Sequence, residues 1–419
     1  MRPAHPPDPS PEQTGTDSLS LRVWRTALAC FILAAATGVL MRFSLLHGFP
    51  FGLQFSDVRH AHSHLMFFGW ITPPLMLLLL QLQGAGISRS VKWLLAGTLL
   101  AALASYVPFL LSGYGLMRIF GRELPVSMMV SGLNGVPWIW FMLMYMLRER
   151  GRPRSSGSGI FLAAVLMLLL SVSSVATLAA AGMGGAGPVT INALAFLYLE
   201  LFAEGWFGLA IIGIAWQQNK AIHTSASRFG LGLLVLALTV RCVADTAVKT
   251  GFTGAEPLVL AGSGLLGLGL LMTLQPLWRA LQARRFGLWH VSVALLAAKG
   301  AFDLLLSVPY IADLSDGAGL NVFYLHAFLL GAVSFGLIAA VRDAWNHAAF
   351  RFPWAFMVAV FIMLAALIPL TGVWPAAWAG TWALQAAAWT SCGPVLIALL
   401  ALAGMPRPRR YPVPRSPQL

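Results

Sequence analysis

Histidines are the residues of this sequence whose type and spacing first indicate chemistry. Three of the nine form the run His60-Ala-His62-Ser-His64, and His326 stands in an apolar stretch far along the chain. Imidazoles contributed at one depth by two helices of a bundle would suit bis-histidine haem ligation. On a helix with 100° per residue, His60 and His64 share a face and His62 points nearly opposite. The run can therefore serve two sites, one on each side of its helix.

Ionisable side chains inside apolar stretches are the second signal, because each costs about 3 kcal/mol at the centre of a bilayer. They occur as three pairs with i,i+4 spacing, which places both members on one helix face: Glu200 with Glu204, Arg241 with Asp245, and Lys299 with Asp303. We expect the two pairs of opposite charge to neutralise themselves. The glutamates have no basic residue on their own stretch, which makes them candidates for a hydrogen-bonded protonated group, a proton carrier or a metal ligand.

The elements that position these residues are predicted to be membrane-spanning helices. Of the 419 residues 58% are hydrophobic and only 10% are charged, with a mean hydropathy of +0.78, which excludes a large soluble domain. At about 20 residues per span, the chain has room for a dozen. Apolar runs and their polar breaks predict an all-α bundle with twelve spans, near 23–43, 58–83, 91–112, 125–147, 159–181, 189–216, 228–248, 257–278, 287–308, 319–341, 352–372 and 376–403.

The net charge of +13 is explained by orientation. If both chain ends are inside, 20 of the 27 Lys and Arg residues lie on inner segments, five lie outside (Arg42, Arg59, Arg118, Arg122 and Lys249) and two lie within spans. Positive charge marks the cytoplasmic side, so we expect an N-in, C-in protein of a bacterial-type cytoplasmic membrane. Membrane lipid then becomes the expected partner of the basic residues, and the main reason to invoke nucleic acid disappears.

The chain ends are predicted to be polar tails, and the cysteines to be isolated from one another. Residues 1–21 are polar and Pro-rich and predict a disordered cytoplasmic tail, 22–404 form the transmembrane domain, and 405–419 form a basic, Pro-rich cytoplasmic tail. Cys30, Cys242 and Cys392 are far apart and fall within spans, so the sequence predicts no disulfide framework, zinc pair or covalent haem attachment.

Two histidine segments resemble a known family. The stretch AHSHLMFFGWITP, residues 61–73, resembles the second span of haem-copper oxidase subunit I, in which a histidine binds a low-spin haem; in that register the ligand is His62. Tyr324-Leu-His326, with Gly331 five residues beyond the histidine, resembles the tenth-span H-x-H of the family, whose second histidine completes that haem site. Tyr324 occupies the first position of the pair.

A third segment extends the resemblance, and a related family offers a different register. ELFAEGWF, residues 200–207, resembles a stretch of nitric oxide reductases in which Glu200 stands at a non-haem metal histidine and Glu204 matches a glutamate. NnrS-type membrane proteins, linked to nitric oxide stress, are the closer likeness. Their motifs are similar to HSHLMFFG, residues 62–69, and to HAFLLGA, residues 326–332, and this register favours His64.

The resemblance implies a haem b held in the outer half of the bilayer by His326 together with His62 or His64. Tyr324 and Arg59 would be further cofactor-binding residues, and Arg42 and Arg59 are candidate propionate partners. Copper or non-haem iron could occupy a degenerate second site, for which Tyr324, Glu200 and Glu204 are the candidates. Counting both sites, the candidate metal ligands are His60, His62, His64, His326, Glu200 and Glu204. The expected partners are a quinol or a cytochrome, with nitric oxide as a ligand.

The departures from the family limit the expected chemistry. The seventh span, LTVRCVADTAV, lacks the paired histidines of the family's second metal, so we do not expect ordinary oxygen or nitric oxide reductase turnover, and no catalytic residue is assigned. One alternative is a twelve-span secondary transporter whose buried acids, Glu200, Glu204, Asp245 and Asp303, relay protons. Another is a structural subunit that keeps the fold without a cofactor.

Overall fold

The structure is a computed structural model that describes residues 11–84, 86–152, 155–345, 347–378 and 380–405. Within these ranges, twelve helical stretches are long and apolar enough to cross a membrane, which confirms the predicted all-α polytopic fold. Six are single helices: α1 (Pro11–His47), α4 (Arg89–Ser112), α7 (Ser158–Met183), α10 (Ser225–Lys249), α12 (Leu288–Leu305) and α17 (Thr381–Ala403). Three more are α5 with α6 (Val126–Gly132, Gly135–Glu149), η4 with α11 (Thr253–Ala255, Glu256–Gln282), and α16 with η7 (Pro353–Leu367, Ile368–Leu370).

The remaining three spans are each interrupted by a π-helical segment. They are α2, η2 and α3 (Phe55–His64, Leu65–Ile71, Thr72–Leu82); α8, η3 and α9 (Pro188–Glu200, Leu201–Gly208, Leu209–Gln218); and α14, η5 and α15 (Asn321–His326, Ala327–Val333, Ser334–Ala344). All twelve stretches coincide with the predicted spans to within a few residues. One boundary differs, because α1 begins at Pro11 and residues 11–21 of the predicted tail are helical. Residues 1–10 and 406–419 of the predicted tails lie outside the described residues.

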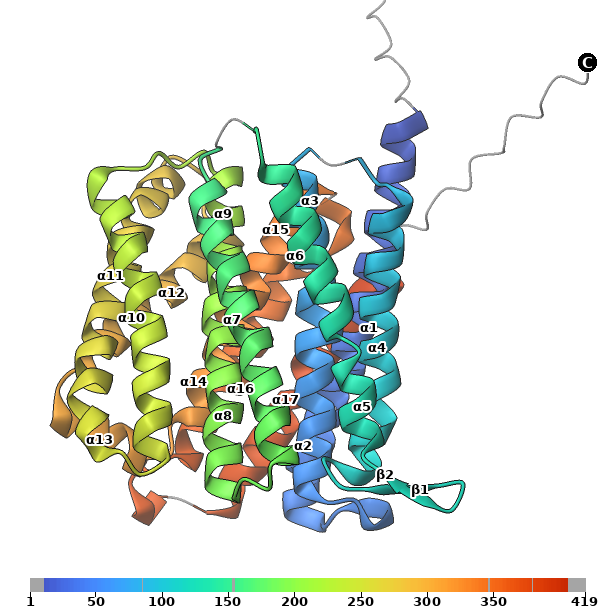
Figure 1. Cartoon of the computed structure of the whole chain (residues 1–419), viewed down its shortest axis with the longest axis vertical. Helices are drawn as coiled ribbons and strands as arrows, with labels where there is room; N and C mark the ends of the chain where they lie inside the picture. Colours follow the sequence, from blue (N-terminus) through green and yellow to red (C-terminus); the bar gives the residue numbers. More distant parts are fainter. Residues whose placement is uncertain (1–10, 85, 153–154, 346, 379, 406–419) are drawn as a thin grey trace, which may run out of the picture.

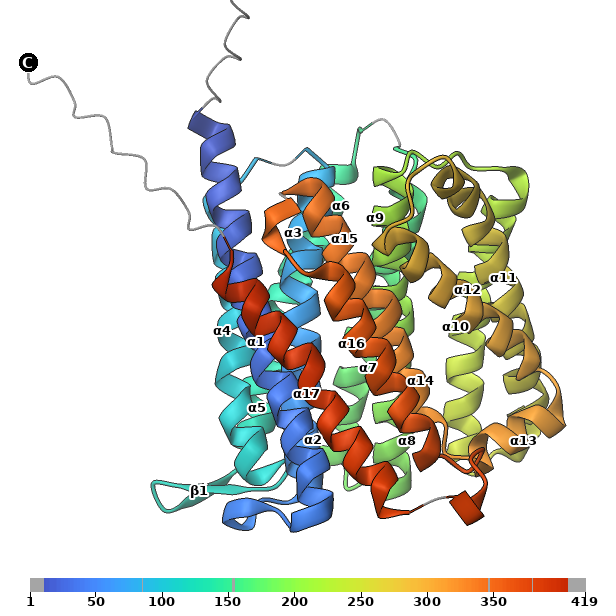
Figure 2. The ribbon, with the colours of Figure 1, turned by 180° about the vertical axis from the view of Figure 1, so that it is seen from behind.

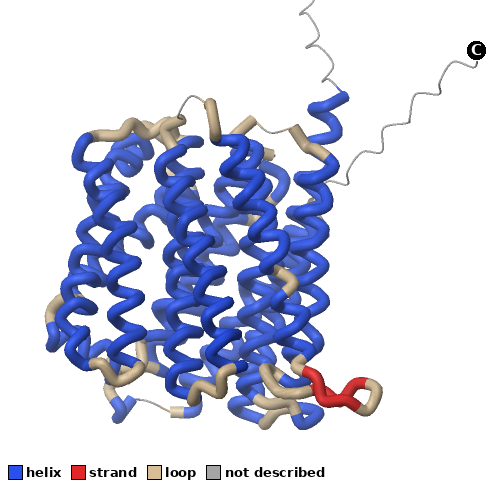
Figure 3. The backbone as a smooth tube through the Cα atoms, viewed as in Figure 1, coloured by secondary structure: helices blue, strands red, loops and turns tan. Residues whose placement is uncertain are grey.

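The helices run side by side in one bundle (Figures 1 and 2). Helix α1 begins, and α17 ends, toward the end drawn at the top of Figure 1, which we call the upper end. The lower end carries the η1 turn (Pro50–Gly52), the short helix α13 (Pro309–Gly317) and a hairpin of β1 (Met117–Ile119) and β2 (Arg122–Leu124), coloured red in Figure 3. The hairpin is antiparallel and pairs Arg118 with Glu123. Helix α17 packs against α1 and α16 across the back of the bundle (Figure 2).

The three interrupted spans form the centre of the bundle. In their most apolar stretches 83%, 67% and 61% of the residues are buried, against 56% or less in the other nine spans. Helices α3, α9 and α15 pack against one another, and the Phe67 and Phe207 rings of η2 and η3 lie 5.9 Å apart. Trp70 Nε1 donates a hydrogen bond to Ser334 Oγ at 3.1 Å, which ties the second span to the tenth.

The π-helical segments lie directly beside the candidate residues. Segment η2 follows His64, η3 follows Glu200 and contains Glu204, and η5 follows His326. At the ends of η2 and η5 a hydroxyl donates a hydrogen bond to the carbonyl oxygen five residues earlier. Thr72 bonds Phe67 at 2.7 Å, and Ser334 bonds Leu329 at 2.8 Å. In the described part of the chain, π-helix occurs nowhere else. Such interruptions are frequent at functional sites because they re-aim side chains within a helix.

Glycine permits the close packing of the outer helices α10, α11 and α12. A Cβ at Gly267 would overlap the Gly300 carbonyl oxygen, and one at Gly269 would lie 2.7 Å from the Leu234 nitrogen. The small-residue run of α11 therefore lets three helix backbones approach closely. This packing brings Arg241 and Lys299 toward the centre of the bundle.

Candidate functional site

His62 projects from α2 toward α1. Its Nδ1 lies 2.7 Å from the Ala34 carbonyl oxygen. Because only a protonated nitrogen can bond a carbonyl, this contact selects the tautomer in which Nε2 carries the lone pair. Among the described residues Nε2 has no hydrogen-bond partner. Helix α1 makes room for the ring at Gly38, where a Cβ would come within 3.0 Å of His62 Cε1.

His326 has the same hydrogen-bonding arrangement on the tenth span. It is the last residue of α14, and its Nδ1 lies 2.7 Å from the Val322 carbonyl oxygen one turn earlier. Its Nε2 likewise bonds to none of the residues that the structure describes. The His326 imidazole interacts electrostatically with His62, and both interact with the Arg42 guanidinium. The bundle therefore brings two imidazoles and one arginine from α1, α2 and α14 together in its lower half.

His60 and His64 lie on the opposite side of α2, as the helical periodicity predicts. His64 Nε2 lies 3.0 Å from the Tyr114 hydroxyl and Nδ1 lies 3.1 Å from Ser131 Oγ, so both ring nitrogens are engaged. The His60 ring meets the Tyr114 ring edge-on at 4.5 Å. The exposed Arg59 interacts electrostatically with His60 and Tyr114, which places it on this side of the helix. Of the two candidate propionate partners, only Arg42 accompanies the His62–His326 pair.

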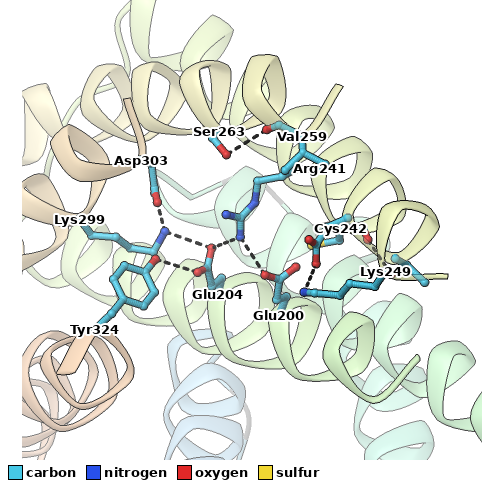
Figure 4. Close-up of polar contacts among 12 residues, drawn as sticks. Glu200, Glu204, Arg241, Cys242, Lys249, Val259, Ser263, Lys299, Asp303 and Tyr324 are labelled. Atoms are coloured by element: carbon cyan, nitrogen blue, oxygen red, sulfur yellow. Dashed lines mark hydrogen bonds and ion pairs between the residues drawn. The ribbon is translucent and has the colours of Figure 1, made fainter. Parts of the chain in front are cut away.

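Glu204 is the centre of a buried charge cluster formed by α8, η3, α10, α12 and α14 (Figure 4). Its Oε2 accepts from Lys299 at 3.0 Å and from Arg241 at 3.5 Å. Its Oε1 accepts from the Tyr324 hydroxyl at 2.8 Å. Lys299 also donates to Asp303 at 2.6 Å, and the side chains of Lys299 and Asp303 are 7% and 0% exposed. We call these residues, with Glu200, the Glu204 cluster.

The pairing within the cluster corrects one prediction and confirms another. Lys299 and Asp303 form the expected i,i+4 pair. The expected pair of Arg241 with Asp245 is wrong, because Arg241 bonds Glu200 at 3.2 Å as well as Glu204, while Asp245 pairs with Lys249. The long guanidinium reaches the neighbouring helix, where two buried carboxylates need a positive charge. Asp245, nearer the lower end, has a lysine one turn away.

The Glu204 cluster has one more acid than bases, so one of its carboxyl groups can carry a proton. Glu200, Glu204 and Asp303 are three acids, against the two bases Arg241 and Lys299. One proton on a carboxyl group would make the cluster neutral, as burial favours. Asp303 Oδ1 and Arg241 Nε have no hydrogen-bond partner among the described residues. A cavity of about 20 Å³ lies beside Glu204 and Lys299, which is room for one water molecule.

The six candidate metal ligands fall into three separate groups. His62 and His326 interact electrostatically, His60 and His64 adjoin Tyr114, and Glu200 and Glu204 lie in the Glu204 cluster. In the residues described, no three His, Cys, Asp or Glu side chains stand close enough together to hold a metal ion. The sequence did not predict the contributions of Gly38, Tyr114 or Ser131, since a single glycine or hydroxyl residue has no signal of its own without the partner it contacts.

Comparison with protein families and curated proteins gives no match, so the function is inferred from the geometry of the site. No protein-family model matches the chain, and no curated protein matches it significantly. The fold defines the class of protein: an all-α membrane protein whose described residues include twelve apolar helical stretches, with half-buried histidines and a buried charge cluster between them.

Proposed function

We propose that the protein binds haem b between its second and tenth spans, with His62 and His326 as the two axial ligands. The main support for the proposal is that the two imidazoles have the same hydrogen-bonding arrangement. Each directs Nδ1 to a backbone carbonyl at 2.7 Å, which leaves Nε2 as an unused acceptor. Histidines that bind metals are commonly oriented through the other ring nitrogen in this way.

The residues around His62 and His326 are chemically suited to a haem. Arg42 interacts electrostatically with both imidazoles and would neutralise a propionate. Phe67 and Phe328, from η2 and η5, are buried in the apolar core of the spans that carry the two histidines. Bound there, haem would supply one-electron chemistry, while the chain's part is to orient the two ligands, balance charge and exclude water.

The same geometry favours electron transfer over catalysis. With both His62 and His326 holding the haem, the group would supply electron transfer rather than a binding site for nitric oxide. At the expected position of a second metal, Glu200 and Glu204 are bonded to Arg241 and Lys299. Copper or non-haem iron would have to displace these cations. We therefore place the protein among electron carriers, with a quinol or cytochrome as partner, or among proteins that respond to nitric oxide.

The test is the optical spectrum of the purified protein after haem-replete expression, with a pyridine haemochrome assay and metal analysis. Wild type should show a low-spin Soret band and one b-type haem per chain. His62→Ala and His326→Ala should lose the low-spin spectrum. His64→Ala is the matched control, because this imidazole uses both nitrogens elsewhere. A colourless wild type would refute haem binding. Loss of the spectrum in His64→Ala but not in His62→Ala would refute the ligand assignment alone.

A second candidate function, proton-coupled transport, is favoured by the Glu204 cluster. Its three acids and two bases leave one site for a proton, as in a carrier that couples substrate movement to protonation. Proton-dependent uptake into vesicles by colourless protein, lost in Glu204→Gln, would favour this function. Uptake unchanged by that substitution would count against it.

We also propose that the upper end of the bundle faces the cytoplasm of a bacterial-type inner membrane. Described residues at that end include Arg22, Arg89, Lys92, Arg148 and Arg284, whereas few basic residues lie at the lower end. Cysteine-labelling of the α1–α2 loop in intact cells tests this orientation: labelling by a membrane-impermeant reagent is expected, and its absence would reverse the topology.

A further inference from the structure

A basic cavity opens at the upper end of the bundle, away from His62, His326 and the Glu204 cluster. Its volume is about 660 Å³, and it is lined by the end of α11, the loop into α12, the end of α15 and the start of α16. The charged groups in its lining are Arg284, Arg285, Arg342 and Asp343, with two histidines beside them. The volume falls within the range of small-molecule sites.

Only some of the charged groups in the lining are paired with other residues of the protein. Asp343 lies 3.8 Å from Arg284 and accepts a hydrogen bond from Trp289 at 3.1 Å, so it is already neutralised. Arg342 donates to the Phe350 carbonyl oxygen and interacts electrostatically with Asp343, which it shares with Arg284. Three arginines against this one carboxylate give the lining two positive charges in excess. Arg285 is exposed and has no ion-pair or hydrogen-bond partner among the residues described. Two positive charges therefore remain available to a ligand.

Apolar aromatic rings stand beside these charges. Phe286 and Trp354 stack with ring centroids 5.9 Å apart and an interplanar angle of 16°. Their side chains are 67% and 44% exposed. Tryptophan at the end of a spanning helix is typical of the level of the lipid headgroups. Arginine with an exposed aromatic pair at this level matches a ligand with a phosphate at one end and hydrocarbon at the other.

We propose that this cavity binds the phosphate group of an anionic phospholipid, with the hydrocarbon chains lying along Phe286 and Trp354. Basic pockets between spanning helices on the cytoplasmic side bind acidic lipid headgroups in this way. The phosphate would pair with Arg285 and Arg342, which bind oxyanions through a planar fork of donors. The same phosphate chemistry could come from a soluble phosphate ester, and the experiment separates the two sources.

The experiment is native mass spectrometry of the full-length protein in detergent with dioleoylphosphatidylglycerol or, as a neutral probe with identical chains, dioleoylphosphatidylcholine. Wild type should bind the phosphatidylglycerol selectively. Arg285→Gln should weaken that binding roughly fivefold, and the double substitution of Arg285 and Arg342 by Gln about 25-fold. Arg279→Gln removes an exposed charge from the last turn of α11, the helix that precedes Arg285, outside the cavity, and should leave binding unchanged.

Each outcome bears on the proposal. Selective binding that is lost in Arg285→Gln and kept in Arg279→Gln supports a lipid occupant. If millimolar inorganic phosphate displaces the lipid, the phosphate chemistry is supported and its source is soluble. Equal binding of the two lipids, or equal weakening by Arg285→Gln and Arg279→Gln, overturns the proposal and leaves only general surface charge. Arg285 has no bonded partner to lose, so its variant should fold normally.

Discussion

Replacing Lys299 by Met should destabilise the protein more than any exposed substitution. The Lys299 ammonium holds two carboxylates, Glu204 at 3.0 Å and Asp303 at 2.6 Å, with side chains that are 9% and 0% exposed. Glu204 would keep Arg241 and Tyr324, but Asp303 has no other hydrogen-bonded partner among the described residues. Leaving such a charge buried and unpaired costs about 3–5 kcal/mol.

Removing the partner charge as well should restore most of this loss. In the double variant Lys299→Met with Asp303→Asn, no uncompensated carboxylate remains at that end of the cluster. We therefore expect the double variant to be more stable than Lys299→Met alone, by about 2 kcal/mol. The matched control is Lys249→Met, since Lys249 pairs with Asp245 at the same i,i+4 spacing but the two side chains are 36% and 23% exposed. Its cost should stay below about 1 kcal/mol.

The assay is equilibrium unfolding in mixed dodecyl maltoside and sodium dodecyl sulfate micelles, followed by tryptophan fluorescence of wild type and the variants. A loss in Lys299→Met no larger than that in Lys249→Met would refute the assignment of a buried, ionised cluster. Strictly additive effects of Lys299→Met and Asp303→Asn would refute the coupling between the two charges. Either result would mean that the acids of the cluster are already neutral.

The remaining predictions concern a glycine and three tyrosines. The side chain of Gly38→Val should displace the His62 imidazole and shift or abolish the haem spectrum. Gly97→Val, whose added Cβ meets nothing within 4 Å, should leave the spectrum unchanged, and optical spectra of both variants test this. Tyr324→Phe removes a hydrogen bond to a charged acceptor and should cost about 1.5–3 kcal/mol in the unfolding assay, against no measurable change for the 75% exposed Tyr310→Phe. Although Tyr114 is 49% exposed, the protein around its phenol partly removes it from water and raises its pKa to about 12 from the usual value of 10.0. The stability due to its neutral phenol is then complete below pH 10 and lost as the pH rises toward 12, so stability should fall less steeply over that range in Tyr114→Phe than in wild type.

The sequence predicted the spans and the faces of individual helices because both depend on local pattern. Apolar runs of about 20 residues mark spans wherever they lie in the chain, and all twelve are present. The 3.6-residue period alone separates His62 from His60 and His64, which the contacts with Ala34 and Tyr114 bear out. Neither result needed knowledge of how the helices pack.

Partners on other helices could not be predicted in the same way. The i,i+4 spacing correctly predicted the pair of Lys299 with Asp303 and wrongly predicted the pair of Arg241 with Asp245. Spacing along one helix contains no information about carboxylates on the adjacent helix, which Arg241 contacts instead. The π-helical segments also escaped prediction, since their extra residue is tolerated only where neighbouring spans pack tightly around it. The three most buried spans are the ones that contain such a segment.

The choice between the two second-span registers shows what the structure adds to the sequence. Likeness to one family favours His62 and likeness to the other favours His64, and their motifs alone do not decide between them. If haem binds as proposed, the hydrogen bonds favour one register, because a ligand needs a free nitrogen lone pair. His64 uses both nitrogens, on Tyr114 and Ser131, whereas His62 keeps Nε2 and interacts electrostatically with His326. A ligand role for His64 would therefore require breaking one of two hydrogen bonds and turning the ring across its own helix, a cost that His62 does not incur.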